Sequence, residues 1–81
     1  MFVRTQNGNT LVNMRNCCYI EKDGDFLMAA LIDSKYLIKL GNYETKEERE
    51  MVIKLLETAI IKEEKIFQMP SKENLKHNYD L

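Results

Sequence analysis

Apolar and polar residues follow two different periods along this chain, and the period changes near residue 45. Before that point, short apolar runs are separated by pairs of turn-forming residues: Asn7-Gly8, Asp23-Gly24 and Asp33-Ser34. Apolar runs bounded in this way are typical of antiparallel strands. After that point, apolar residues recur at the spacing of one helical face. We therefore predict an α+β domain.

The first half is predicted to form five short strands, at residues 2–6, 10–13, 17–22, 25–32 and 36–40. Asn-Gly and Asp-Gly favour two-residue hairpins, because both residues tolerate a positive φ. This succession of strands and turns predicts an antiparallel β-meander of about four or five strands.

The second half is predicted to form one long helix that begins after Thr45. Thr45 and Glu48 have the spacing of a capping box, in which each side chain accepts a hydrogen bond from the other residue's backbone amide. The helix could run for about five turns, because neither Gly nor Pro interrupts it before residue 65. Its apolar stripe consists of Met51, Val52, Leu55, Leu56, Ala59 and Ile60. We expect this stripe to pack on one face of the sheet.

The turns also predict which strand residues share that face. A two-residue turn at Asp23-Gly24 places Ile20 opposite Leu27. Extending the same pairing through the next turn places Cys18, Ile20, Leu27, Ala29, Leu31, Tyr36, Ile38 and Leu40 on the helix-facing side. The expected partners in that next hairpin are Ala29 with Ile38, Leu27 with Leu40, and Leu31 with Tyr36.

The opposite face of the predicted sheet is also apolar, and only one long helix is available to cover the two faces. Its residues would be Cys17, Tyr19, Met28, Ala30, Ile32 and Leu37. Either the N-terminal hairpin or the segment around Phe67 folds over it, or another chain does. These six residues are therefore the predicted interface of a homodimer or a protein complex.

The C-terminal part is predicted to leave the helix before Pro70. The residue before a proline avoids helical geometry, so residues 66–69 form either a last helical turn or an extended stretch that folds back on the domain. Residues 71–81 are mostly polar and are predicted to be a flexible tail. This gives a single domain over residues 1–70.

Composition narrows the function classes. The 81 residues carry a net charge of −1, which argues against a dedicated nucleic-acid module because such modules usually have a basic excess. A nucleic-acid-binding accessory role remains the alternative, and it would require Arg4, Arg15, Lys35 and Lys39 to cluster. No apolar run is long enough to span a bilayer and the N-terminus does not resemble a signal peptide, so we expect a cytoplasmic protein without a membrane partner.

Residues for catalysis, metal binding or cofactor binding are not found in a recognisable pattern. Cys17 and Cys18 are adjacent and cannot staple a fold, and His77, the only histidine, lies in the predicted tail. Zinc usually requires four ligands at characteristic spacing, and glycine-rich phosphate loops are missing. We therefore expect no enzyme, no cofactor and no small-molecule substrate.

Three segments resemble small uncharacterised proteins of Gram-positive bacteria and their phages. They are Val3-Arg-Thr-Gln-Asn7 with Leu11-Val-Asn13, Leu40-Gly-Asn-Tyr-Glu-Thr-Lys-Glu-Glu48, and Ile66-Phe-Gln-Met-Pro70. The resemblance covers residues 2–13 and 40–70 and implies a prophage or mobile-element context, with no known activity. The uncovered sheet face and the tail, rather than the resemblance, favour a small non-catalytic interaction module.

Overall fold

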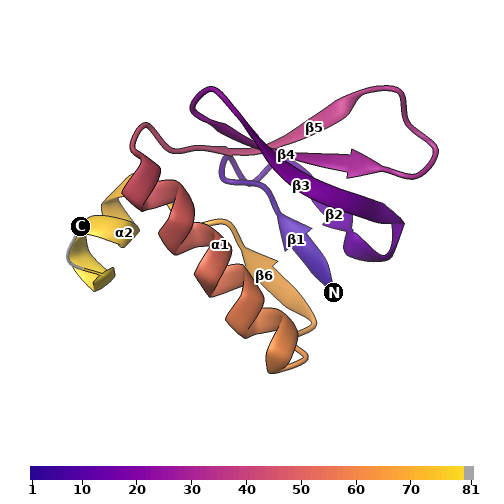
Figure 1. The fold of residues 1–81 in the computed structure, drawn as a ribbon. Helices are drawn as coiled ribbons and strands as arrows, with labels where there is room; N and C mark the ends of the chain where they lie inside the picture. The colour runs from indigo at the N-terminus through magenta and orange to yellow at the C-terminus, as the bar shows by residue number, and fades with distance from the viewer. Residues whose placement is uncertain (80–81) are drawn as a thin grey trace.

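The computed structural model describes the backbone of residues 1–79 and the side chains of residues 1–76. Six strands, one short 3₁₀ helix and two α-helices follow one another (Figure 1). They are β1 (Phe2–Arg4), β2 (Leu11–Asn13), η1 (Met14–Asn16), β3 (Cys17–Asp23), β4 (Phe26–Leu31), β5 (Leu37–Asn42), α1 (Lys46–Ile61), β6 (Ile66–Gln68) and α2 (Lys72–Tyr79). The content confirms the α+β class.

The strands form two sheets where the sequence predicted one meander. One sheet has the order β3-β4-β5 and is fully antiparallel, whereas the other has the order β2-β1-β6. In this second sheet β6 runs parallel to β1, so it closes a crossover that includes the whole of α1. The meander is broken at η1, where the Asn13 side chain accepts a hydrogen bond from the Arg15 amide and turns the chain.

The first hairpin exists, but its turn is wider than the predicted two-residue Asn-Gly turn. The Thr5 amide donates to the Thr10 carbonyl, and the Gly8 amide donates to the Thr5 carbonyl. The Asn7 side chain accepts hydrogen bonds from the Thr5 hydroxyl and the Asn9 amide, which stabilises the longer loop. Within this loop Gly8 takes a positive φ, of 78°, whereas Asn7 does not.

The second hairpin is displaced by one residue from its predicted position. Gly24, with a φ of 59°, occupies the first central position of the turn and Asp25 the second, so Asp23 pairs with Phe26. Glycine at the first central position is typical of a type II′ turn. The displacement moves Ile20 from Leu27 to Ala29, a shift of two residues that leaves the same side chains on each face.

The third hairpin keeps the predicted pair Ala29–Ile38, but its other two predicted pairs are wrong. A bulge between Leu27 and Met28 places Leu27 opposite Gly41, and β5 begins only at Leu37, after Tyr36. The bulge lets the end of β5 curve toward α1.

The capping box at the start of α1 is confirmed. Thr45 Oγ1 accepts from the Glu48 amide at 3.1 Å, and Glu48 Oε1 accepts from the Thr45 amide at 3.1 Å. Of the predicted stripe, Val52, Leu56 and Ala59 are buried, Met51 and Leu55 are half-buried, and Ile60 is exposed. Placing Ile60 on the core face was therefore wrong.

The helix ends earlier than predicted, at Ile61, because Glu63 takes the left-handed conformation. Its φ is 56°, and its amide donates to the Ile60 carbonyl while the Glu64 amide donates to the Ala59 carbonyl. These two bonds form a Schellman motif, which usually employs glycine. The reversal leads directly into β6, which confirms the extended alternative for residues 66–69.

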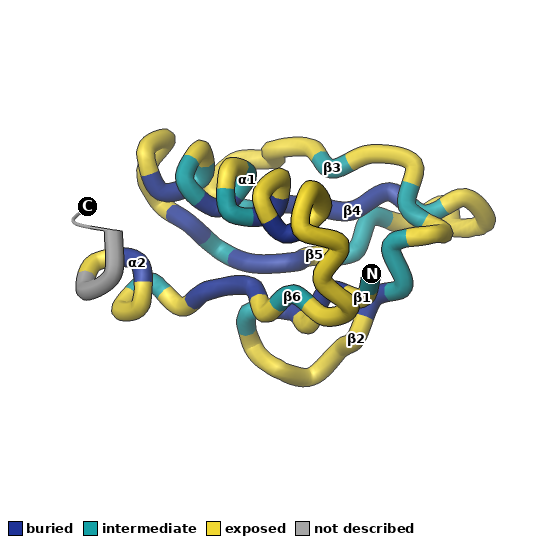
Figure 2. The backbone as a smooth tube through the Cα atoms, turned by 90° about the horizontal axis from the view of Figure 1, so that it is seen from below, coloured by how far each residue is buried: buried dark blue, intermediate teal, exposed yellow. Residues whose placement is uncertain are grey.

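Both sheets and α1 surround a single core (Figure 2). Its buried members are Val3, Val12, Leu27, Ala29, Leu40, Tyr43, Val52, Leu56, Met69 and Leu75. Leu75 belongs to α2, so the predicted flexible tail is corrected: the segment that follows Pro70 forms a helix and contributes to the core. Only Asp80 and Leu81 of that predicted tail lie outside the described backbone.

A polar junction joins the two sheets at their common end. The Tyr43 hydroxyl donates to the Pro70 carbonyl at 2.7 Å, and the Gln6 side-chain amide donates to the same oxygen at 3.3 Å. Gln6 Oε1 accepts from the Asn42 amide at 2.8 Å. Gly41 gives the Tyr43 ring room, because a Cβ at this position would lie 2.8 Å from Tyr43 Cε2.

We expect Leu56→Ala to reduce the free energy of unfolding by about 2–4 kcal/mol, because it leaves a cavity in the core. Ile61→Ala is the matched control, since Ile61 lies on the same helix and is 81% exposed. Urea melts of the two variants test this expectation. Equal losses would show that α1 does not pack by the face described here.

We expect the Tyr43 phenol to ionise at a higher pH than an exposed tyrosine. Burial, and secondly the negative charge of Glu48, raise the pKa of the Tyr43 phenol. An unfolded tyrosine has a pKa of about 10. The contribution of the buried phenol to the free energy of unfolding should therefore be complete below that pH and fall as the pH rises above it.

Tyrosinate absorbance during an alkaline titration measures this behaviour. Tyr43→Phe should abolish the late ionising fraction, flatten the loss of stability above pH of about 10, and cost about 1 kcal/mol at neutral pH through the lost hydrogen bond. A titration curve unchanged by the substitution would contradict the burial of this phenol.

Candidate functional site

The side of the β3-β4-β5 sheet that points away from the core is the candidate contact surface, called here the outer face. Alternation along the paired strands assigns to it Tyr19 and Glu21 of β3, Phe26, Met28 and Ala30 of β4, and Leu37 and Lys39 of β5. Ile32 extends it just beyond β4. No element of the described backbone is drawn over this side of the sheet (Figure 1).

Neither of the two segments predicted to cover the outer face does so. Val3 and Val12 of the N-terminal hairpin belong to the core cluster, and Phe67 of β6 packs against it. That cluster includes Leu27 and Ala29, which lie on the other side of β4 from Met28 and Ala30. The outer face is thus open as far as the described residues are concerned.

The six predicted interface residues do not all contribute exposed surface. Tyr19 and Ile32 are 54% and 61% exposed, and Leu37 is half-buried. Met28 and Ala30 lie on the outer face but are only 6% and 8% exposed, because β4 is the central strand and is flanked on both sides.

Cys17 lies on the other side of the sheet from its predicted position. A bulge between Cys17 and Tyr19 pairs Cys17 with Leu31, and both residues pack against the core cluster. The same bulge leaves Cys18, which was predicted to face the helix, exposed. An extra residue in a strand reverses the side of everything before it, and no turn signal in the sequence marks it.

The prediction missed Phe26 on this surface, and it also missed the exposure of Tyr36. Phe26 lies beneath the Lys39 ammonium group, which is 4.4 Å from the ring centroid. Alternation from Met28 would have placed Phe26 on this side. Tyr36 is 81% exposed in the loop between β4 and β5, although a tight turn would have placed it on the core face.

The Cys17 thiol does not have the surroundings of an activated nucleophile. The Cys17 thiol donates to the Tyr19 carbonyl at 3.3 Å, and burial is the main cause that raises its pKa, which disfavours the nucleophilic thiolate. The described side chains contain no group of three or more His, Cys, Asp and Glu residues that could hold a metal ion. The side chain of His77 lies outside the described ones.

The basic residues required by the nucleic-acid alternative come from separate elements. Arg4 lies in β1, Arg15 in η1, Lys35 in the β4–β5 loop and Lys39 in β5. These elements belong to two different sheets and their connections. No single element among the described residues therefore carries all four of these basic residues.

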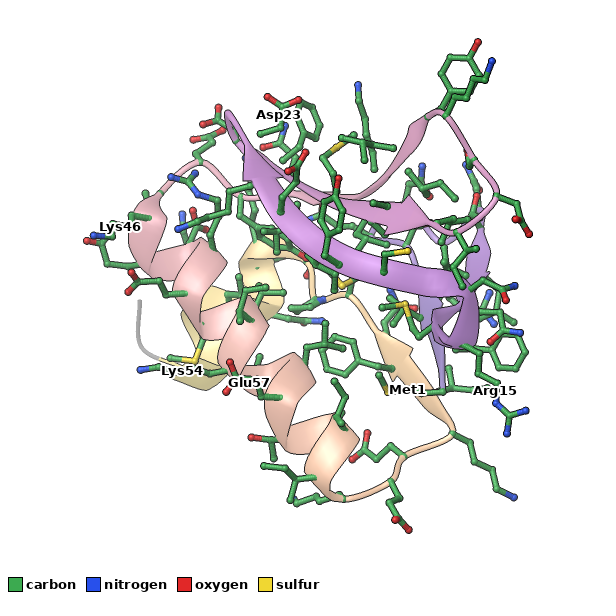
Figure 3. All side chains as sticks on the ribbon, turned by 45° about the vertical axis from the view of Figure 1, so that its right-hand side comes forward. Met1, Arg15, Asp23, Lys46, Lys54 and Glu57 are labelled. Atoms are coloured by element: carbon green, nitrogen blue, oxygen red, sulfur yellow. The ribbon has the colours of Figure 1, made fainter. Side chains whose placement is uncertain are left out.

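A second open feature is a groove between β3 and α1, called here the β3–α1 groove. It consists of two adjoining hollows of about 380 and 510 Å³, and both are lined by Ile20, Ile53 and Glu57. Figure 3 shows α1, with Lys54 and Glu57 labelled, beside β3, whose turn end is marked by Asp23. Sequence reasoning missed the groove because it depends on the angle between a helix and a strand.

We expect Cys18 to react with iodoacetamide several-fold faster than Cys17 at about pH 8. Cys18 is exposed, whereas burial raises the pKa of the Cys17 thiol and limits access to it. Mass spectrometry of Cys17→Ser and Cys18→Ser variants would give the two rates separately. Faster alkylation at Cys17 would refute the bulge.

Comparisons with known proteins add no further constraint. No helix in the described part of the chain is long and apolar enough to cross a membrane. No protein-family model, curated protein sequence or solved structure matches this chain.

Proposed function

We propose that this chain is a small non-catalytic protein-interaction module that binds a protein partner, or a second copy of itself, through the outer face. The observation that carries the proposal is the exposure of Tyr19 and Ile32 on a sheet face that the described residues do not cover. Large side chains of this kind supply contact area when they are desolvated by a partner.

The arrangement of the outer face supports a protein rather than a small molecule as the ligand. The hollow lined by Phe26 and Lys39 has a volume of about 130 Å³, well below the usual 300–1,000 Å³ of small-molecule sites. The larger hollows that Glu21 and Tyr19 help to line belong to the β3–α1 groove. Tyr19 and Ile32 supply the exposed apolar area, and Glu21 and Lys39 supply charges on the same face. Apolar residues surrounded by polar ones are typical of protein interfaces.

The cellular setting is part of the same proposal. We place the protein in the cytoplasm, because both cysteines are free and reducing compartments keep thiols in that state. The resemblance of its terminal segments supports an accessory role in a prophage or a mobile element. The nucleic-acid alternative has less support, because the net charge is −1.

We expect Ile32→Asp to abolish partner binding while leaving the fold intact. The substitution puts a charge into the exposed apolar area, and Ile32 is 61% exposed and lies outside the core cluster. The matched control is Ile61→Asp, which adds the same charge at an 81% exposed position on α1. Immobilised wild type and both variants would be compared by quantitative mass spectrometry of proteins retained from the host lysate.

A partner supports the proposal only under two conditions. It must be retained by the wild type and by Ile61→Asp and lost with Ile32→Asp, and the purified partner must reproduce that order in a direct titration. Partners that bind all three proteins equally would place the contact surface elsewhere and refute the outer face. Association of the purified chain with itself that Ile32→Asp abolishes would identify a second copy as the occupant.

A further inference from the structure

β3 is an edge strand, and its edge opposite β4 pairs with no other described strand. The sheet order is β3-β4-β5, and every residue from Cys18 to Asp23 except Ile20 is exposed. Figure 2 shows this strand almost entirely in the exposed colour beside the buried β4. Unpaired edges of this length offer a row of backbone donors and acceptors to another strand.

Hydrogen bonding around β4 identifies the groups that point outward from β3. The Tyr43 amide donates to the Asp25 carbonyl, and the Ile32 amide donates to the Asn16 carbonyl. The backbone groups of β4 therefore alternate in direction. Those of odd-numbered residues point toward β5, and those of even-numbered residues point toward β3. Glu21 and Tyr19, which pair with Met28 and Ala30, therefore bond toward β4. The amides and carbonyls of Ile20 and Lys22 point the other way, out of the edge of the sheet.

Only certain registers let this edge pair with a copy of itself. In an antiparallel two-fold pair, the outward amides and carbonyls of Ile20 and Lys22 must face outward amides and carbonyls of the second copy. This is possible only when the two-fold axis lies at one residue, which then faces the same residue of the second copy. An axis at Glu21 or Lys22 places two like charges directly opposite each other, which is unfavourable. An axis at Tyr19 puts the bulge between Cys17 and Tyr19 at the centre, where it interrupts the ladder.

An axis at Ile20 avoids both problems. Ile20 then meets Ile20 of the second copy, and each Tyr19 lies opposite the second copy's Glu21 on the outer face. The bulge falls at the end of the paired region, where Cys18 meets Lys22 of the second copy. No like charges are opposed between Cys18 and Lys22 in this register.

The β3–α1 groove offers the second copy a further contact. The groove brings Ile20 next to Ile53 and Glu57 of α1, so a two-fold axis at Ile20 places the two α1 helices on the same side of the joined sheet, antiparallel to each other. The flank of α1 along the groove carries charges of both signs: Arg49, Glu50, Lys54 and Glu57. When two such flanks lie antiparallel, the positive groups of one can face the negative groups of the other. A partner that carries charges of only one sign would instead be repelled by the like charges of the flank.

We propose that two copies of this chain pair antiparallel through the free edges of β3, centred on Ile20, so that their two three-stranded sheets become one continuous sheet with both α1 helices on one side. The occupant of the β3–α1 groove is thus a second copy. This proposal does not rest on the outer face as a binding surface. It would, however, join the outer faces of both copies into one larger surface.

Substitutions at Tyr19 test the register, with the dimer dissociation constant measured by sedimentation equilibrium. Tyr19→Lys should tighten the dimer, because two Lys–Glu21 pairs form across the axis, and Tyr19→Glu should weaken it by opposing two carboxylates. Each change should be roughly 2- to 30-fold, since two cross-strand pairs are affected per dimer. Adding Glu21→Lys to Tyr19→Glu should restore the wild-type constant or improve it.

The control separates this interface from association through the outer face. Ile32 lies beside Asn16, beyond the Cys18–Lys22 segment that pairs with the second copy, so Ile32→Asp should leave the dissociation constant unchanged. Weakening by both Ile32→Asp and Tyr19→Lys would indicate the outer face and overturn the proposal. A mass of 9.6 kDa up to about 1 mM protein would overturn it as well.

Amide hydrogen exchange supplies a structural readout that does not depend on mutation. The amides of Ile20 and Lys22 should exchange rapidly in dilute protein and become protected as the dimer forms, while the inward amide of Glu21 is protected throughout. Protection of Ile20 and Lys22 that does not change with concentration would contradict pairing through this edge.

Discussion

The carbonyl oxygen of Pro70 is the buried acceptor at the centre of the polar junction between the two sheets. It accepts hydrogen bonds from the Tyr43 hydroxyl and from the Gln6 side-chain amide, and Tyr43 is completely buried. The Tyr43 amide in turn donates to the Asp25 carbonyl, and the Tyr43 carbonyl accepts from Arg49 Nη1 at 2.7 Å. One side chain with its own backbone groups thus links β4, α1 and the end of β6. Leaving the Tyr43 hydroxyl unpaired at so buried a position would lower the free energy of unfolding. The placement of Tyr43 and that of the Pro70 carbonyl therefore depend on each other.

This junction brings together residues from three separate stretches of the sequence. The Val-Arg-Thr-Gln stretch supplies Gln6, the Leu-Gly-Asn-Tyr stretch supplies Gly41 and Tyr43, and the Ile-Phe-Gln-Met-Pro stretch supplies Pro70. Gly41 is needed because the tyrosine ring occupies the space of a side chain. These residues build the scaffold.

The same scaffold determines which surfaces remain open. Both sheets and α1 close around one core, so the β3-β4-β5 sheet has a packed side and an open side. β5 is joined to the loop after β1, where the Gln6 amide donates to the Leu40 carbonyl, whereas β3 has no neighbour beyond β4 among the described strands. In a chain of 81 residues, a single core cannot cover every face and edge. The outer face and the β3 edge are the consequence.

Local signals in the sequence determined the start of α1, the three hairpins and the side of most strand residues, because a capping box, a turn pair and alternation act over a few neighbouring positions. The sequence also identified Tyr19 and Ile32 of the candidate surface. Only the tertiary structure decided the division into two sheets, the left-handed Glu63, the side on which Cys17 lies and the burial of Leu75. Each of these depends on contacts between distant segments: β6 must return to β1, a bulge must fit its partner strand, and α2 must complete the core. Such contacts leave no periodic trace in the sequence.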